Sequence, residues 1–142
     1  MLLAHLAVLA TALFTGAAAY VSLVEHPARL QCPNEIALEQ WRPSYRRGTV
    51  MQASLAIAGT LLGISAWLSG AGRIWLVAGI LLGSVVPFTL LVIFPTNRRL
   101  DDLGLNASSE TARSLLVRWG QLHAVRSALS LAALLLMLFV PR

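Results

Sequence analysis

The chain has 142 residues, of which 57% are hydrophobic and only 12% are charged, and its mean hydropathy is +0.72. A soluble domain has about half apolar and about a quarter charged residues, so this composition excludes an ordinary soluble protein. The net charge is +5, and all eleven basic residues are arginines. They flank apolar segments, which favours a lipid bilayer as the surroundings and argues against a nucleic-acid partner. One cysteine, Cys32, excludes an internal disulfide.

Four apolar runs lie at residues 2–24, 49–69, 74–94 and 120–140. Each approaches or exceeds the roughly 20 residues that an α-helix needs to cross about 30 Å of hydrocarbon. The first run has no basic leader and is longer than the apolar part of a signal peptide, so we expect it to be retained. The sequence therefore predicts an all-α fold, in which residues 1–142 form a single four-helix transmembrane bundle.

The segments between the runs predict how the bundle is oriented. Segments 26–48 and 95–119 each carry four arginines, whereas the opposite side has only Arg73 and Arg142. Loops rich in arginine stay on the cytoplasmic side of a membrane. We therefore expect both longer loops in the cytoplasm and both termini outside.

These longer loops are expected to contain short helices. Asn34 can cap a helix that ends before Pro43, because proline disfavours helical structure in the residue that precedes it. Ser108 or Ser109 can cap a helix that runs into the fourth span. Pro87, inside the third span, predicts a kink.

The second and third spans each contain two glycines four residues apart, Gly59 and Gly63 in one and Gly79 and Gly83 in the other. Small residues at this spacing let two membrane helices approach closely. A link of four residues, 70–73, makes the two spans an antiparallel pair. We expect the glycines to pack within one bundle, with a homo-oligomer through the same glycines as the alternative.

The fourth run begins with two polar residues, His123 and Arg126. The apolar stretch from Ser127 to Val140 has only 14 residues. They give about 21 Å of helix, which is too short to cross the hydrocarbon layer of a membrane. The helix therefore has to begin near Gln121, which places both polar residues within the membrane. An arginine at the helix centre costs roughly 2.5–3.5 kcal/mol, so Arg126 is expected to have a partner. The alternative is that both residues snorkel to the headgroups as anchors.

Four residues of the fourth span recur at helical spacing and share one face, namely Trp119, His123, Arg126 and Ser130. If this face points into the bundle, it meets the ends of the first and third spans, where Glu25 and Asn97 stand. Glu25 is the candidate partner of Arg126, although it could also pair with Arg29 if Pro27 leaves the helix intact.

Such a cluster suits acid–base chemistry without a metal. His123 can accept a proton from a weakly acidic carbon or phenol. Arg126 and Asn97 can stabilise the oxyanion that results, and Glu25 can orient His123 or balance Arg126.

A flat aromatic substrate can reach this site from the lipid. We expect it to contact four residues, Trp119, Tyr45, Trp41 and Arg29. The alternative role for Trp41 and Tyr45 is anchoring at the membrane interface. A second alternative is an iron site made by Glu25, His26 and His123, or haem with His123 as its axial ligand.

Four stretches, "AAAYVSLVEHPARL", "WRPSYRRGTVMQ", "FPTNRRL" and "WGQLHAVRSAL", resemble the anthrone oxygenase-like family of small four-helix integral membrane proteins. The resemblance implies a cofactor-independent monooxygenase that converts an anthrone to an anthraquinone, by enolate formation followed by reaction with O2. With it we expect a multi-pass protein of the bacterial inner (plasma) membrane. Two other classes stay open at this stage: a non-enzymatic transport or assembly subunit, and a redox protein that binds haem or a metal.

Overall fold

The computed structural model describes residues 1–139, so Val140 and Arg142, on which two of the sequence-based expectations depend, lie outside the described residues. All regular elements in this range are helical. Four helices are long and apolar enough to cross a membrane: Leu2–Arg29, Asn34–Ala71, Arg73–Asp101 and Glu110–Phe139. The predicted all-α fold, with four helices that are long and apolar enough to span a membrane, is therefore confirmed.

Three of the four spanning helices are interrupted. The first consists of α1 (Leu2–Tyr20), the π-helical turn η1 (Val21–Glu25) and α2 (His26–Arg29). The second consists of α3 (Asn34–Ala66) and a π-helical turn, η2 (Trp67–Ala71). The third consists of α4 (Arg73–Gly83), α5 (Val85–Phe88), the π-helical turn η3 (Thr89–Ile93) and α6 (Phe94–Asp101), and the fourth is the single helix α7 (Glu110–Phe139).

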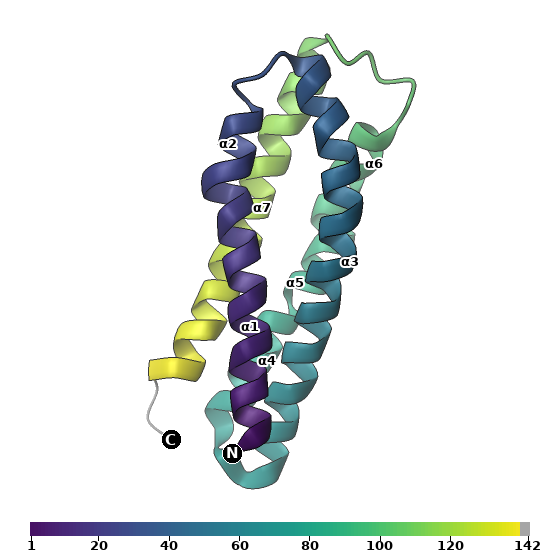
Figure 1. Cartoon of the computed structure of the whole chain (residues 1–142). Coiled ribbons are helices and arrows are strands. Elements are labelled where there is room, and N and C mark those ends of the chain that lie inside the picture. The colour runs from purple at the N-terminus through teal and green to yellow at the C-terminus, as the bar shows by residue number, and fades with distance from the viewer. Residues whose placement is uncertain (140–142) are drawn as a thin grey trace.

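The helices run up and down beside one another, and both α1 and α4 pack against α3 and α7. Figure 1 shows the N-terminus, the α3–α4 link and the last turn of α7 at one end of the bundle. The start of α7 lies at the other end, together with α2 and α6. The predicted grouping of the loops is thus present, while the assignment of one end to the cytoplasm stays a prediction. Arg29 is buried, at 5% exposure, so it serves the interior of the bundle and should not count toward orientation.

The predicted short helix ending before Pro43 is wrong, because α3 continues through Pro43 without a break. Ala37, Leu38 and Trp41 are buried in the core, and this packing holds the first turns of α3 in line with the rest of the helix. Pro43 itself is exposed, so the carbonyl that it leaves without a backbone donor is not trapped in the core. The expected cap is also wrong, because Asn34 lies in the first turn of α3 and makes no capping bond there.

The cap expected at the start of α7 is confirmed for Ser109. Its Oγ accepts a hydrogen bond from the backbone N–H of Ala112 at 3.1 Å. This bond satisfies one of the free N–H groups at the helix start, so α7 begins where the sequence predicts.

Prolines explain two of the three π-helical turns. His26 precedes Pro27 and donates its backbone N–H to the carbonyl of Val21, five residues earlier. Phe94 precedes Pro95 and donates in the same way to Thr89. Because the proline ring clashes with the carbonyl four residues before it, the helix widens by one residue ahead of each proline. Ahead of Pro87 the third helix is interrupted at Ser84, between α4 and α5, and the kink expected from this proline stays a prediction.

The paired glycines pack against each other inside the chain. A Cβ added at Gly63 would lie 3.3 Å from the Cα of Gly79, and one at Gly79 would lie 3.2 Å from the carbonyl oxygen of Thr60. A Cβ added at Gly59 would lie 2.6 Å from the side chain of Leu82, and one at Gly83 would lie 3.0 Å from the side chain of Thr60. All four glycines therefore serve packing within one chain, as the sequence analysis favoured, and association of several chains stays a prediction.

Candidate functional site

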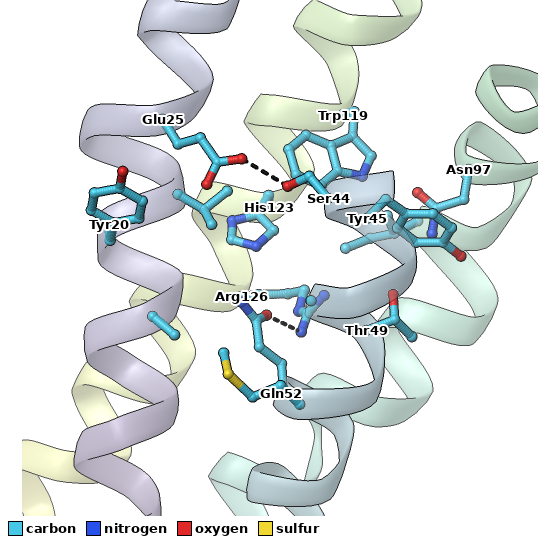
Figure 2. Close-up of a pocket in the computed structure, with 15 residues that line it drawn as sticks. Tyr20, Glu25, Ser44, Tyr45, Thr49, Gln52, Asn97, Trp119, His123 and Arg126 are labelled. Atoms are coloured by element: carbon cyan, nitrogen blue, oxygen red, sulfur yellow. Dashed lines mark hydrogen bonds between the residues drawn. The ribbon is translucent and has the colours of Figure 1, made fainter. Parts of the chain in front are cut away.

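A cavity of about 190 Å³ lies between α1, α3, α6 and α7, toward the end of the bundle that carries the longer loops. Six of the eight residues singled out from the sequence line it: His123, Arg126, Asn97, Glu25, Trp119 and Tyr45. Figure 2 shows these six around one space, with His123 in its centre. The other two do not line the cavity but pack against residues that do: Trp41 against Tyr45, and Arg29 against Trp119. The structure thus brings together the residues that the sequence predicted, from four helices.

One wall of the cavity is aromatic. The rings of Trp41 and Tyr45 stack at 4.7 Å with an interplanar angle of 4°. Trp119 meets the edge of Trp41 at 5.8 Å and lies 4.9 Å from the ring of His123. Because Trp41 is fully buried, it acts as backing for the two aromatic residues that face the cavity. A wall of this kind suits a flat aromatic molecule.

His123 is buried, at 3% exposure, and has one occupied and one unoccupied ring nitrogen. Nδ1 lies 3.0 Å from the hydroxyl of Ser22 on η1. Nε2 has no hydrogen-bond partner among residues 1–139, although the ring lines the cavity. The side chain is therefore anchored on one edge, and its other nitrogen is available to a molecule in the cavity.

His26 differs from His123 because both of its ring nitrogens are occupied. Nε2 donates to the carbonyl of Leu116 at 2.9 Å. Nδ1 accepts a hydrogen bond from Nη1 of Arg29 at 3.0 Å, and the ring packs on Trp119. We infer that His26 joins α2 to α7 as a structural residue.

Gly120→Ala is expected to disturb this join. A Cβ at position 120 would clash with Cδ2 and Nε2 of His26, whose ring is held by two hydrogen bonds. Overpacking of this kind costs about 1–3 kcal/mol, which denaturation in mixed detergent micelles can measure. Gly16→Ala is the control, since nothing lies within 4 Å of a Cβ there. Equal unfolding free energies for the two variants would contradict this role of Gly120.

Arg126 carries a positive charge that no acid among residues 1–139 neutralises. Its Nη2 donates to Oε1 of Gln52 at 2.9 Å, and its guanidinium lies 5.6 Å from the ring centre of Phe14. Its Nε is buried and has no partner, and within the described residues no carboxylate lies at ion-pair distance from it. Charged side chains inside membrane proteins are almost always paired, so an unpaired one that lines a cavity indicates a functional site.

The expected pairing of Glu25 with Arg126 is wrong. Glu25 accepts from Arg29 at 2.5 Å, from Ser44 at 2.7 Å and from Gln40 at 3.1 Å. The helix continues through Pro27 as α2, and this keeps Arg29 one turn from Glu25. Glu25 also makes no hydrogen bond with His123; that contact belongs to Ser22. Glu25 therefore closes the cavity at its upper edge in Figure 2, with its charge already balanced.

Asn97 is 2% exposed and lines the cavity from α6. Its Oδ1 is buried and has no hydrogen-bond partner in the described part of the chain, residues 1–139. A buried amide group without a partner costs free energy, so it indicates a position that a bound molecule completes.

Several residues of the site were missed by the sequence reasoning. They are polar residues within or beside the spans, namely Ser22, Ser44, Gln52 and Ser127. The signal was available for Gln52, a polar residue inside an apolar run and only 4% exposed. The small serines gave no such signal, because serine is common at helix contacts in membranes.

The metal set considered from the sequence is not assembled. Over residues 1–139 no three His, Cys, Asp or Glu side chains lie close enough together to hold a metal ion. His26 in particular directs both nitrogens at protein partners.

The cavity reaches the outer face of the bundle between α1 and α3. Tyr20 of α1 and Met51 of α3 line it, and these side chains are 56% and 50% exposed. In Figure 2, Tyr20 stands on α1 beside this gap. The mouth of the cavity therefore opens to the side of the helices, where a bilayer would lie.

Comparison with known proteins decides the family. The family model described as anthrone oxygenase matches residues 41–136, a stretch that contains Tyr45, Asn97, His123 and Arg126. The chain belongs to the anthrone oxygenase family. Membership makes it an enzyme of the oxygenase class, as the resemblance implied.

Individual members of the anthrone oxygenase family match over most of the chain. The anthrone oxygenase of Claviceps purpurea is 32% identical, over 90% of this chain and 82% of its own length. Anthrone oxygenase tpcL of Aspergillus fumigatus is 35% identical, over 85% and 81%. Anthrone oxygenase AgnL2 of Paecilomyces divaricatus is 31% identical, over 92% and 89%. These relatives are fungal, so the bacterial inner membrane stays a prediction. No solved structure is significantly similar to the chain.

Proposed function

We propose that the protein is a membrane-embedded, cofactor-independent oxygenase that oxidises an anthrone-like or other hydrophobic aromatic substrate with O2. The observation that carries this proposal is one cavity that holds a free histidine nitrogen, an arginine without an acid and an amide without a partner. A base, a cation and an amide are the groups needed to form an enolate and to stabilise its negative oxygen.

The first step is removal of a proton from carbon. In an anthrone, the CH2 group between the two aryl rings lies opposite the ketone, so its proton is weakly acidic. Nε2 of His123 takes this proton, and the electron pair of the broken C–H bond moves through the ring to the carbonyl oxygen. Arg126 and the Nδ2–H group of Asn97 donate hydrogen bonds to this oxygen as it becomes negative. Both stand in a largely apolar space, where such interactions are stronger than in water.

The second step is the reaction of the enolate with O2. The former CH2 carbon bonds to one oxygen atom, and the proton held by His123 neutralises the resulting peroxide. Removal of the second C–H proton then breaks the O–O bond, which gives a new ketone and releases water. One O2 is consumed for each quinone formed, with one oxygen atom in the quinone and one in water.

The aromatic wall and the side opening support a flat apolar substrate. Tyr45 and Trp119 offer ring faces to it, while Tyr20 and Met51 border the mouth. A substrate dissolved in the bilayer reaches the cavity through this mouth without crossing water. Arg29 contributes indirectly, since its guanidinium lies 5.8 Å from the ring centre of Trp119 and it binds Glu25.

The test is O2 uptake by purified protein in nanodiscs, with anthrone as the substrate and a protein-free sample as the control. We expect accelerated uptake, one O2 per quinone, and one ¹⁸O atom in the quinone when ¹⁸O2 is supplied. An uptake rate equal to that of the protein-free sample, with several anthrones, would contradict the proposal. A Soret band, or a stoichiometric metal that His123→Ala removes, would contradict the cofactor-independent part and make His123 a ligand.

A further inference from the structure

Two serines connect His123 to the backbone of α1. The hydroxyl of Ser22 lies 3.0 Å from Nδ1 of His123 and 2.8 Å from the hydroxyl of Ser127. The Ser127 hydroxyl in turn lies 3.1 Å from the carbonyl oxygen of Ala18 and 3.2 Å from that of His123. These contacts form one chain of hydrogen bonds from the imidazole ring to α1 and back to α7.

The donor and the acceptor of each hydrogen bond in this series follow from the two carbonyl oxygens, of Ala18 and His123, at which the series ends. A carbonyl oxygen can only accept, so the two carbonyls beside Ser127 favour placing its single hydroxyl proton toward Ala18 or toward the carbonyl of its own helix. Ser127 must then accept from Ser22. Once the Ser22 proton is used in this way, Ser22 can bind the imidazole only as an acceptor, so the proton of the neutral ring stands on Nδ1.

The reverse direction is disfavoured by the same geometry. If Ser127 donated to Ser22 and Ser22 donated to Nδ1, the Ser127 oxygen would face two carbonyl oxygens at 3.1 and 3.2 Å without a proton between them. Two electron-rich oxygens at hydrogen-bond distance repel each other when no proton joins them. The neighbouring His26 shows that the fold selects tautomers in this way, because its contacts with Leu116 and Arg29 fix the proton on Nε2.

We propose that Ser22 and Ser127 are positioning residues that hold the proton of His123 on Nδ1 and so keep Nε2 as the base that faces the cavity. The inference rests on the proposed function for its catalytic meaning. The tautomer itself is a property of the resting protein and is measurable without any substrate. A hydrogen bond at one ring nitrogen of a histidine decides which of the two nitrogens carries the proton.

The π-helical turn places Ser22 for this task. Ser22 lies in η1, which the chain forms ahead of Pro27, and η1 contacts α7 directly. Within the same turn Val21 and Glu25 line the cavity, whereas Ser22 reaches past it to α7. π-helical turns of this kind often occur at functional sites, because they let neighbouring residues serve different surfaces.

The experiment is NMR of protein labelled with ¹⁵N-histidine, in which the protonated and the unprotonated ring nitrogen give separate signals. His123→Gln assigns the His123 signals by difference. We expect Nδ1–H in the wild type, and a shift toward Nε2–H or a mixture in both Ser22→Ala and Ser127→Ala. An Nε2–H tautomer in the wild type, or an unchanged Nδ1–H in both serine variants, overturns the proposal.

Activity gives a second readout. Ser22→Ala should lower kcat by about 10- to 100-fold with little change in KM, which is a smaller loss than removal of the base itself. Ser22→Thr keeps the hydroxyl and should restore most of the rate. Ser130→Ala is the matched control, because Ser130 is a buried serine of α7, the helix of His123 and Ser127, and its hydroxyl donates to the backbone carbonyl of Ser127. A fully active His123→Gln would overturn the proposed function and leave the tautomer result standing, so the two failures are distinguishable.

Discussion

His123→Gln is expected to lower kcat by about 10²- to 10⁴-fold, the range found for loss of a general base. The amide of glutamine can still bond to Ser22, so the packing around the position should survive. It cannot accept a proton from carbon at neutral pH. Initial rates of quinone formation at saturating substrate measure the loss directly.

His5→Gln is the matched control for this result. His5 is an exposed residue in the first turn of α1, the helix that begins beside the N-terminus at the end of the bundle away from the longer loops (Figure 1), and its substitution should leave the rate unchanged. Size-exclusion profiles and melting temperatures of both variants should equal those of the wild type. A His123→Gln variant that retains more than about one third of the wild-type rate would rule out His123 as the base.

Arg126→Met is expected to lower kcat by about 10²- to 10³-fold without lowering stability. Loss of one group that stabilises a developing oxyanion costs this much in known enzymes. The charge of Arg126 is half-buried and has no acid partner, so the folded protein gains nothing from an ion pair there. Methionine keeps the volume and removes the cost of a charge in apolar surroundings. The paired measurement is kcat together with the denaturation midpoint in mixed micelles.

Two further variants sharpen this prediction. Arg126→Lys keeps the charge but not the planar donor group, so it should recover only part of the rate. Arg46→Met is the control, because Arg46 forms an exposed ion pair with Asp101, and such pairs contribute little. A marked loss of stability in Arg126→Met at an unchanged rate would show that Arg126 is structural.

Local patterns in the sequence were sufficient for much of the fold. Four apolar runs, the Ser109 cap and the glycine spacing each depend on residues within a few turns of one another. The face shared by Trp119, His123 and Ser130 was also predictable, because an uninterrupted helix keeps a period of 3.6 residues over its whole length. All three side chains are buried in the bundle.

Pairings between distant segments were not predictable in the same way. Arg126 binds Gln52, 74 residues away, and His123 binds Ser22, 101 residues away. The sequence offered Glu25 for both roles, since charge alone made it the obvious partner. In the structure Glu25 forms an ion pair with Arg29, because α2 continues through Pro27.

The sequence by itself determined that this protein is a bundle of four helices long and apolar enough to cross a membrane, with a polar cluster at the inward face of its last helix. Only the tertiary structure decided which residues meet His123 and Arg126. For His123 the physical reason lies in η1, since an extra residue in a helical turn rotates the later part of the helix by about 100° relative to the earlier part. A helical wheel drawn from the sequence does not contain that rotation. The rotation determines whether Ser22 or Glu25 faces His123.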